Sequence, residues 1–165
     1  IPVFWTHELG TSPEQGSFAL TVFFSIGIFM TYIGGLLGDK YGPIKIIRLS
    51  LLIWLPSMFL LTQVPEFSVT IMMPLAYLIL LMIGAAKAIS YSPVIVLGQT
   101  YLAKSIGFAS GITLGVSQTI GGIKAPVVGN LADTYSLPAA MMTLVTFLIL
   151  GQIASLLLKD PKKLQ

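Results

Sequence analysis

The 165-residue chain has no cysteine and a single histidine, His7. It therefore holds no disulfide, no thiol nucleophile and no cysteine-ligated metal, and one imidazole cannot form a histidine metal cluster. Charge is also scarce, because only 9% of the residues are Asp, Glu, Lys or Arg while 55% are hydrophobic. A water-soluble domain of this length needs far more polar surface, so the composition argues against a soluble globular fold.

Apolar stretches long enough to cross a bilayer follow one another along the chain. No charged residue occurs at 15–38, 49–65, 67–86, 105–123 or 134–158, and a spanning helix needs about 20 consecutive apolar residues. Ahead of them, Ile1 to Trp5 runs into a polar loop as the last turn of a longer helix does. The pattern predicts an all-α polytopic membrane protein, a fragment that begins inside a helix, with spans at 17–38, 46–64, 68–97, 107–131 and 138–158.

Basic residues gather at alternate ends of these stretches. All of the nine Lys and Arg residues except Lys87 and Lys124 lie there: Lys40, Lys45, Arg48, Lys104, Lys159, Lys162 and Lys163. Such ends face the cytoplasm, so we expect the carboxy terminus in the cytoplasm and the protein in the cell (inner) membrane. Basic residues beside apolar spans contact anionic membrane lipid, and nucleic acid is not an expected partner although the net charge is +3.

Glycines recur at helical spacing in two of the predicted spans. Small residues at this spacing let two helices approach closely. We therefore expect helix packing at Gly27, Gly34, Gly38, Gly107, Gly111 and Gly115. By contrast, the spans at 46–64 and 138–158 are bulky and apolar all round, which favours contact with lipid.

Two segments that end glycine-rich spans resemble each other. Segment 35–43 (GLLGDKYGP) and segment 129–138 (GNLADTYSLP) share glycine, leucine, aspartate and tyrosine in register. Three predicted spans separate them, so they fall on opposite sides of the membrane. Three helices related to three others by inverted topology is an arrangement of transporters.

The first of these segments resembles the signature loop of the major facilitator superfamily, which reads glycine, three residues, aspartate, a basic residue, any residue, glycine and further basic residues. The match departs at Pro43 and Ile44, and basic residues resume with Lys45. In that family the loop aspartate helps to hold one state of an alternating-access cycle. The resemblance therefore implies a gating loop that contains Gly35, Asp39, Lys40, Gly42 and Lys45. Arg48 is among the candidate partners of the loop aspartate.

Segments 96–102, 107–115 and 121–126 look like the carboxy-terminal half of the fosmidomycin-resistance-like branch of that superfamily. This resemblance implies half of a major facilitator fold, built as 3+3 inverted helix repeats, with the stub of helix seven and helices eight to twelve. Its partner is then the missing amino-terminal half of the same transporter. The expected activity is secondary transport of a small-molecule substrate, with efflux of a small organic or drug-like compound by antiport as the branch expectation.

Two lysines lie inside apolar spans, where a charge costs about 2.5–3.5 kcal/mol unless a cavity or a partner relieves it. Lys124 either extends its amine to the outer surface or lines a cavity. Lys87 is farther from both ends of its span, which favours a water-filled cavity. Tyr91 lies one turn further on, and Pro93 frees a backbone carbonyl at Ile89 that neighbouring hydroxyls can satisfy.

Gln118 places an amide near the middle of the span at 107–131, where it either bonds a neighbouring helix or lines the transport path. The candidate substrate-binding residues are therefore Lys87, Tyr91, Gln118 and Lys124. No Asp or Glu lies deep in a predicted span, and an enzyme needs inward acids, histidines or a nucleophile with a base. The sequence thus argues against an enzyme and implies no cofactor. Two alternatives to efflux stay open: uptake of an anionic metabolite, which the lysines favour, and a non-transporting membrane scaffold.

Overall fold

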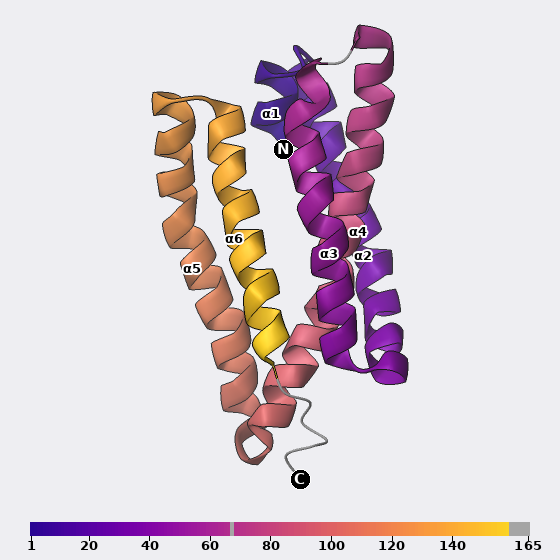
Figure 1. Ribbon diagram of the computed structural model, residues 1–165, viewed down its shortest axis with the longest axis vertical. Helices are drawn as coiled ribbons and strands as arrows, with labels where there is room; N and C mark the ends of the chain where they lie inside the picture. The colour runs from indigo at the N-terminus through magenta and orange to yellow at the C-terminus, as the bar shows by residue number, and fades with distance from the viewer. Residues whose placement is uncertain (67, 159–165) are drawn as a thin grey trace.

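The computed structural model describes residues 1–66 and 68–158, apart from the side chains of Glu66, Val69, Thr70 and Lys124. Within that part every regular element is a helix (Figure 1). In chain order the elements are α1 (Pro2–His7), α2 (Pro13–Tyr41), α3 (Pro43–Gln63), the 3₁₀ turn η1 (Val64–Glu66), α4 (Val69–Tyr101), the 3₁₀ turn η2 (Ala103–Ser105), α5 (Ile106–Thr134) and α6 (Leu137–Leu157).

The helices α2 to α6 are each long and apolar enough to cross a membrane. The chain is therefore an integral membrane protein, and the predicted all-α polytopic fold is confirmed. Helices run on past the apolar stretches because a helix keeps its backbone groups paired where the chain leaves the bilayer. Thus α2 begins at Pro13 and α4 ends at Tyr101, beyond the predicted spans 17–38 and 68–97.

Short local signals set the helix ends. Pro13 and Pro43 occupy first-turn positions of α2 and α3, where the missing N–H is not needed. The Ser12 hydroxyl accepts a hydrogen bond from the Gln15 N–H at 3.4 Å and so caps α2. Between α2 and α3 stands Gly42 with φ of +92°, a conformation that side chains other than glycine rarely adopt.

The central helix of the bundle is α4. Both α2 and α3 pack along it, α6 packs on α3, and α5 forms a hairpin with α6 (Figure 1). The α4–α5 connection is closed by the Gln99 side-chain amide, which donates to Ser110 Oγ at 2.8 Å. Burial follows this arrangement, since 39% of the most apolar stretch of α4 is buried against 6% for α5. The outer helix α5 therefore leaves most of its surface uncovered by the described chain.

Two apolar clusters close the bundle at opposite ends. At the α1 end, Trp5 is fully buried and stacks edge-on against Tyr77 of α4, with ring centroids 5.6 Å apart. At the other end, Ile44 and Ile47 of α3 pack with Leu97 of α4. Between the clusters, α2 and α4 contact each other through small residues.

Glycine lets α2 and α4 touch backbone to backbone. A Cβ added at Gly34 would meet the Ile89 carbonyl oxygen and lie 2.7 Å from the Ile89 Cα. This carbonyl has no helical N–H partner, because Pro93 stands four residues further on. The hydroxyl of Ser90, one of those expected to satisfy it, donates instead to the Lys87 carbonyl at 2.9 Å. The Cα–H of Gly34 thus faces the freed carbonyl, as in a weak C–H···O hydrogen bond.

The remaining glycines with an expected packing role divide between α2 and α5. Gly38 is buried, and a Cβ added there would lie 3.1 Å from the Pro93 ring, whereas one at Gly27 would lie 4.0 Å from Ala88 Cβ. Among the described residues, no neighbouring atom lies within 4 Å of a Cβ added at Gly107, Gly111 or Gly115. The α2 stripe therefore packs within this chain. The α5 stripe faces away from it, and helix packing there stays a prediction.

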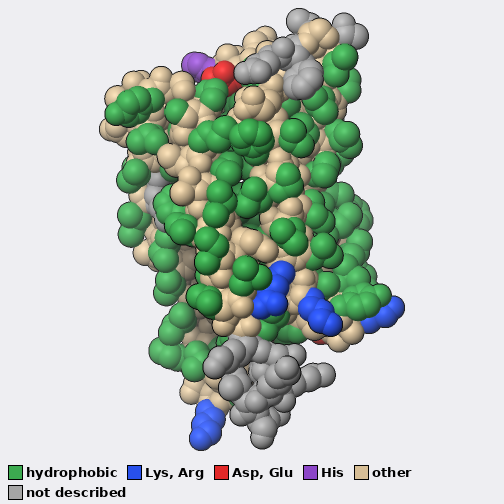
Figure 2. Space-filling model, in the orientation of Figure 1, with side chains coloured by type: hydrophobic (Ala, Val, Ile, Leu, Met, Phe, Trp, Pro, Cys, Tyr) green, Lys and Arg blue, Asp and Glu red, His purple; other side chains and the backbone are tan. Residues whose placement is uncertain are grey.

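Apart from Lys87 in the middle of α4, the charged side chains that the structure describes lie near the two ends of the bundle. Figure 2 shows Lys and Arg near the lower end of the molecule and acidic residues with histidine near the upper end. The turn after α2, which follows Asp39, lies at the lower end, and the turn after α5, which follows Asp133, lies at the upper end (Figure 1). The two similar sequence segments are thus at opposite ends of the bundle.

Candidate functional site

A groove of about 270 Å³ runs between α2 and α4 at mid-bundle. Its wall on α2 is formed by the successive turns that contain Phe23, Phe24, Gly27, Ile28 and Thr31. Its wall on α4 is formed by Gly84, Lys87, Ala88 and Tyr91. Two of the predicted substrate-binding residues, Lys87 and Tyr91, therefore lie together in one groove.

The ammonium group of Lys87 is the one formal charge in this groove. The side chain is exposed, and Nζ lies 5.2 Å from the centroid of the Phe23 ring, a cation–π geometry. Neither wall offers an acid, because α2 has no carboxylate between Glu14 and Asp39 and α4 has none at all. Among the side chains that the structure describes, the cation is therefore held by an aromatic face and not by a counter-charge.

Depth in the helix excludes a simple surface role for Lys87. At about 1.5 Å per residue, it lies about 27 Å from the start of α4 at Val69 and about 21 Å from its end at Tyr101. A lysine stem cannot carry its charge to either end of the helix over such distances. Contact with lipid tails at this depth costs about 2.5–3.5 kcal/mol. The groove side of α4 must therefore face water, another protein segment or a ligand.

The hydroxyl groups beside Lys87 differ in their availability. The Thr31 hydroxyl donates to the Gly27 carbonyl of its own helix at 2.8 Å. Tyr91, one turn beyond Lys87, is half exposed at 50% and presents its ring to the groove. The groove thus combines one cation with aromatic walls and few polar atoms.

The other two candidate substrate-binding residues lie elsewhere. Gln118 is exposed on α5 and lines neither the α2–α4 groove nor the second groove, along α5, that is described next. The side chain of Lys124 lies outside the described residues. A groove of about 470 Å³ does run along α5, lined by Phe108, Gly111, Ile112, Gly115, Val116, Thr119 and Ile120.

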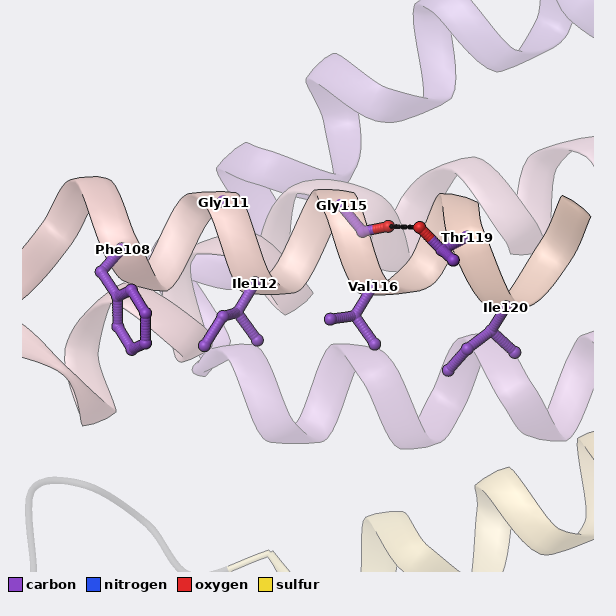
Figure 3. A pocket seen from close by; sticks show the side chains of 7 residues that line it. All are labelled: Phe108, Gly111, Ile112, Gly115, Val116, Thr119 and Ile120. Atoms are coloured by element: carbon purple, nitrogen blue, oxygen red, sulfur yellow. Dashed lines mark hydrogen bonds between the residues drawn. The ribbon is translucent and has the colours of Figure 1, made fainter.

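Figure 3 shows that the large apolar side chains of this α5 groove form one row along the helix. The polar side-chain group in the lining of this groove is the Thr119 hydroxyl, which donates to the Gly115 carbonyl at 2.9 Å. The lining of the α5 groove is therefore almost entirely apolar and contains no titratable side chain.

The predicted gating loop surrounds the turn from α2 to α3. Asp39, Lys40 and Lys45 are exposed, and Lys40 Nζ lies 5.1 Å from the Tyr41 ring centroid. Gly35 lies one turn inside α2, where an added Cβ would be 3.3 Å from Ser92 Oγ. The loop thus stands at the basic end of the bundle, on the surface.

Arg48, a candidate partner of Asp39 in the sequence, binds a different group. Its Nε donates to the Ser155 carbonyl at 3.0 Å, and one terminal nitrogen donates to the carbonyls of Leu156 and Leu158 at 3.2 and 3.3 Å. The last carbonyls of a helix lack helical partners and carry the negative end of its dipole. Arg48 therefore fastens α3 to the end of α6.

Sequence reasoning missed Phe23 and Phe24 as groove residues. The α4 wall was recoverable, because Gly84, Lys87 and Tyr91 recur at helical spacing on one face. The α2 wall was not, since nothing in the local sequence tells which helix packs against α4 or at which height.

An ionisable side chain in the middle of a long apolar helix marks a candidate functional site of a membrane protein. The chain belongs to the Major Facilitator Superfamily, whose family model matches residues 1–164. Membership points to membrane transport and away from enzymatic catalysis.

A relative from Bacillus subtilis (strain 168), named as the uncharacterized MFS-type transporter YfnC, is 33% identical over 151 residues. The match covers 92% of this chain and 35% of that protein, so the chain spans about a third of the relative's length. No solved structure matches the chain.

Proposed function

We propose that this chain supplies the carboxy-terminal half of a secondary transporter: the end of the seventh helix, with α2 to α6 as helices eight to twelve. The transporter moves a small organic solute by alternating access, in a fold built from 3+3 inverted repeats. Two observations support this proposal. The similar segments ending α2 and α5 lie at opposite ends of the bundle, and the relative of matching family is a far longer protein. The amino-terminal half of the same transporter is the partner that encloses the path.

The observation that carries the proposal is Lys87 in the α2–α4 groove. A charge about 21 Å from the nearer end of its helix is stable only beside water, protein or a solute. Transport requires such a site near the middle of the membrane, accessible from each side in turn. Lys87 and Tyr91 therefore contact the solute, and Gln118 and Lys124 are assigned to the same path from the other helix hairpin.

The proposed direction is efflux by exchange, as in the fosmidomycin-resistance-like branch that segments 96–126 resemble. Uptake of an anionic metabolite is the second candidate, and Lys87 favours it because a fixed cation attracts an anion.

Membrane orientation follows the charge distribution: the basic end of the bundle and the carboxy terminus lie on the cytoplasmic side of the inner membrane. In this orientation Asp39 and its neighbours in the gating loop act on the cytoplasmic side.

Transport in proteoliposomes tests the proposal. The native gene product is reconstituted with Lys87→Met and, as a matched control, Lys104→Met, which removes an exposed lysine from the basic end. Lys87→Met should abolish or strongly reduce solute movement without preventing membrane insertion, and Lys104→Met should leave it near the native rate. Equal rates in all three proteins would demote Lys87 to a structural residue. Accumulation inside whole cells, in place of extrusion, would replace efflux by uptake.

The scaffold reading makes an opposite forecast. A protein that only organises other membrane components moves no solute and has no use for a cation in the groove. If the native gene product shows no movement of any solute across a broad panel, while it inserts and folds, the scaffold function stands and the transporter is refuted.

A further inference from the structure

The charge at Lys87 is exceptional because its neighbour is a ring and not an acid. The attraction of a cation to an aromatic face is worth about 0.5–2 kcal/mol. Moving a lysine charge to this depth costs about 2.5–3.5 kcal/mol. The Phe23 ring, at 5.2 Å, therefore offsets only part of that cost. Water in the groove or a bound anion would supply the remainder, and the anion would also attract the ammonium group by its opposite charge.

The lining also disfavours other solutes. A sugar or polyol needs several side chains that donate and accept hydrogen bonds, and the polar side chains of this groove are those of Thr31, Lys87 and Tyr91. The Thr31 hydroxyl already donates to the Gly27 carbonyl. A cationic solute would be repelled by Lys87. The groove chemistry therefore selects against neutral polar and cationic compounds.

Shape favours a flat apolar body. Phe23 and Phe24 lie edge to face, with centroids 5.5 Å apart and planes at 76°, and Tyr91 lines the opposite wall. Aromatic rings attract one another at centroid distances of about 4.5–7 Å. The groove volume of about 270 Å³ lies below the range of about 300–1,000 Å³ that drug-sized ligands occupy. A compound of one ring fits this space better than a larger one.

We infer that the α2–α4 groove binds a small aromatic monoanion, with its acidic group on Lys87 and its ring among Phe23, Phe24 and Tyr91. This inference rests on the proposed transport function and specifies its substrate class. Lys87 selects the charge of the solute. Phe23 holds the Lys87 ammonium group in the groove when no solute is bound, and it contacts the ring of the solute when one is.

Equilibrium binding of matched probes tests the inference. The purified native gene product in detergent is dialysed against labelled benzoate, its neutral isostere benzamide and the cation benzylamine. Benzoate should bind about tenfold or more tightly than benzamide, because benzamide can still accept a hydrogen bond from Lys87 but lacks the negative charge that attracts the ammonium group. Benzylamine should bind most weakly. Equal affinity for benzoate and benzamide, or no binding of benzoate, overturns the inference.

Three variants assign the effect to the groove. Lys87→Met should lower the affinity for benzoate to that for benzamide, Lys87→Arg should restore most of the preference, and Lys104→Met should change neither. Phe23→Leu should weaken both probes, because both lose an aromatic wall. A benzoate preference that survives Lys87→Met overturns the assignment. Since the comparison of probes on the native protein needs no variant, poor folding of Lys87→Met leaves the inference testable.

The two proposals fail in different ways. If the protein moves a neutral or cationic solute in a Lys87-dependent manner, the transport function stands and the aromatic-anion inference is wrong. If it binds benzoate through Lys87 but moves no solute across a membrane, the ligand class stands and the transport function is wrong.

Discussion

Replacing Gly34 by alanine should separate α2 from α4. The added methyl group would meet the Ile89 carbonyl oxygen and lie 2.7 and 2.8 Å from the Ile89 Cα and carbonyl carbon. All three are backbone atoms of a helix, so none can rotate away as a side chain would. Carbon–oxygen contacts are normally no shorter than about 3.3 Å. The two helices must therefore move apart, by roughly 1 Å on that scale.

The expected cost follows from two opposing effects. Overpacking a tight interface costs about 1–3 kcal/mol, and the backbone contact at Gly34 points to the upper part of that range. Alanine favours the helical state over glycine by about 1 kcal/mol, which offsets part of the loss. We expect a net destabilisation of about 1–2 kcal/mol.

The matched control is Gly151→Ala in α6, where no described atom lies within 4 Å of an added Cβ. It gains the same helix propensity without a clash, so its stability should equal or exceed that of the native protein. Equilibrium unfolding of the purified proteins in a mild detergent measures the difference. If Gly34→Ala proves as stable as Gly151→Ala, the close backbone approach at Ile89 is not present in the protein.

Three further predictions concern the basic end of the bundle. Arg48→Gln should remove hydrogen bonds worth about 1–3 kcal/mol between α3 and the end of α6, so amide hydrogen exchange at the end of α6 should become faster. Lys45→Gln, which changes an exposed neighbour, should leave that exchange rate unchanged. Gly42→Ala should destabilise by about 1–3 kcal/mol although nothing lies near the added methyl, because alanine is strained at φ of +92°; an unchanged unfolding midpoint would contradict that turn geometry. Asp39→Asn should slow turnover more than it weakens substrate binding, and equal loss of both would argue against gating.

The spanning helices could be predicted because lipid leaves the backbone few choices. Uncharged stretches of about 20 residues must pair their own peptide groups, which only a helix does within one segment. The helix ends were harder to predict, because Pro13 and Tyr101 lie beyond the predicted spans 17–38 and 68–97, and water as well as the helix can satisfy backbone groups outside the hydrocarbon core.

The glycine stripes show where the sequence carried too little information. Gly34 on α2 and Gly111 on α5 belong to similar patterns, yet one touches a neighbouring backbone and the other faces open space. The spacing of the glycines indicates that another helix can approach closely, but it does not indicate which helix does so or whether that helix belongs to this chain. Arg48 makes the same point, because a cation near Asp39 in sequence donates instead to the carbonyls of Ser155 and Leu156 at the end of α6.

The contact between Gly34 and the Ile89 carbonyl has a consequence for selectivity. Because the backbones of α2 and α4 are in contact at Gly34, we expect the two helices to move together in the proposed transport cycle. The groove beside Lys87, which these two helices form, would then keep its width during that cycle. We therefore expect the width of this groove to limit the size of the solute that the proposed transporter accepts.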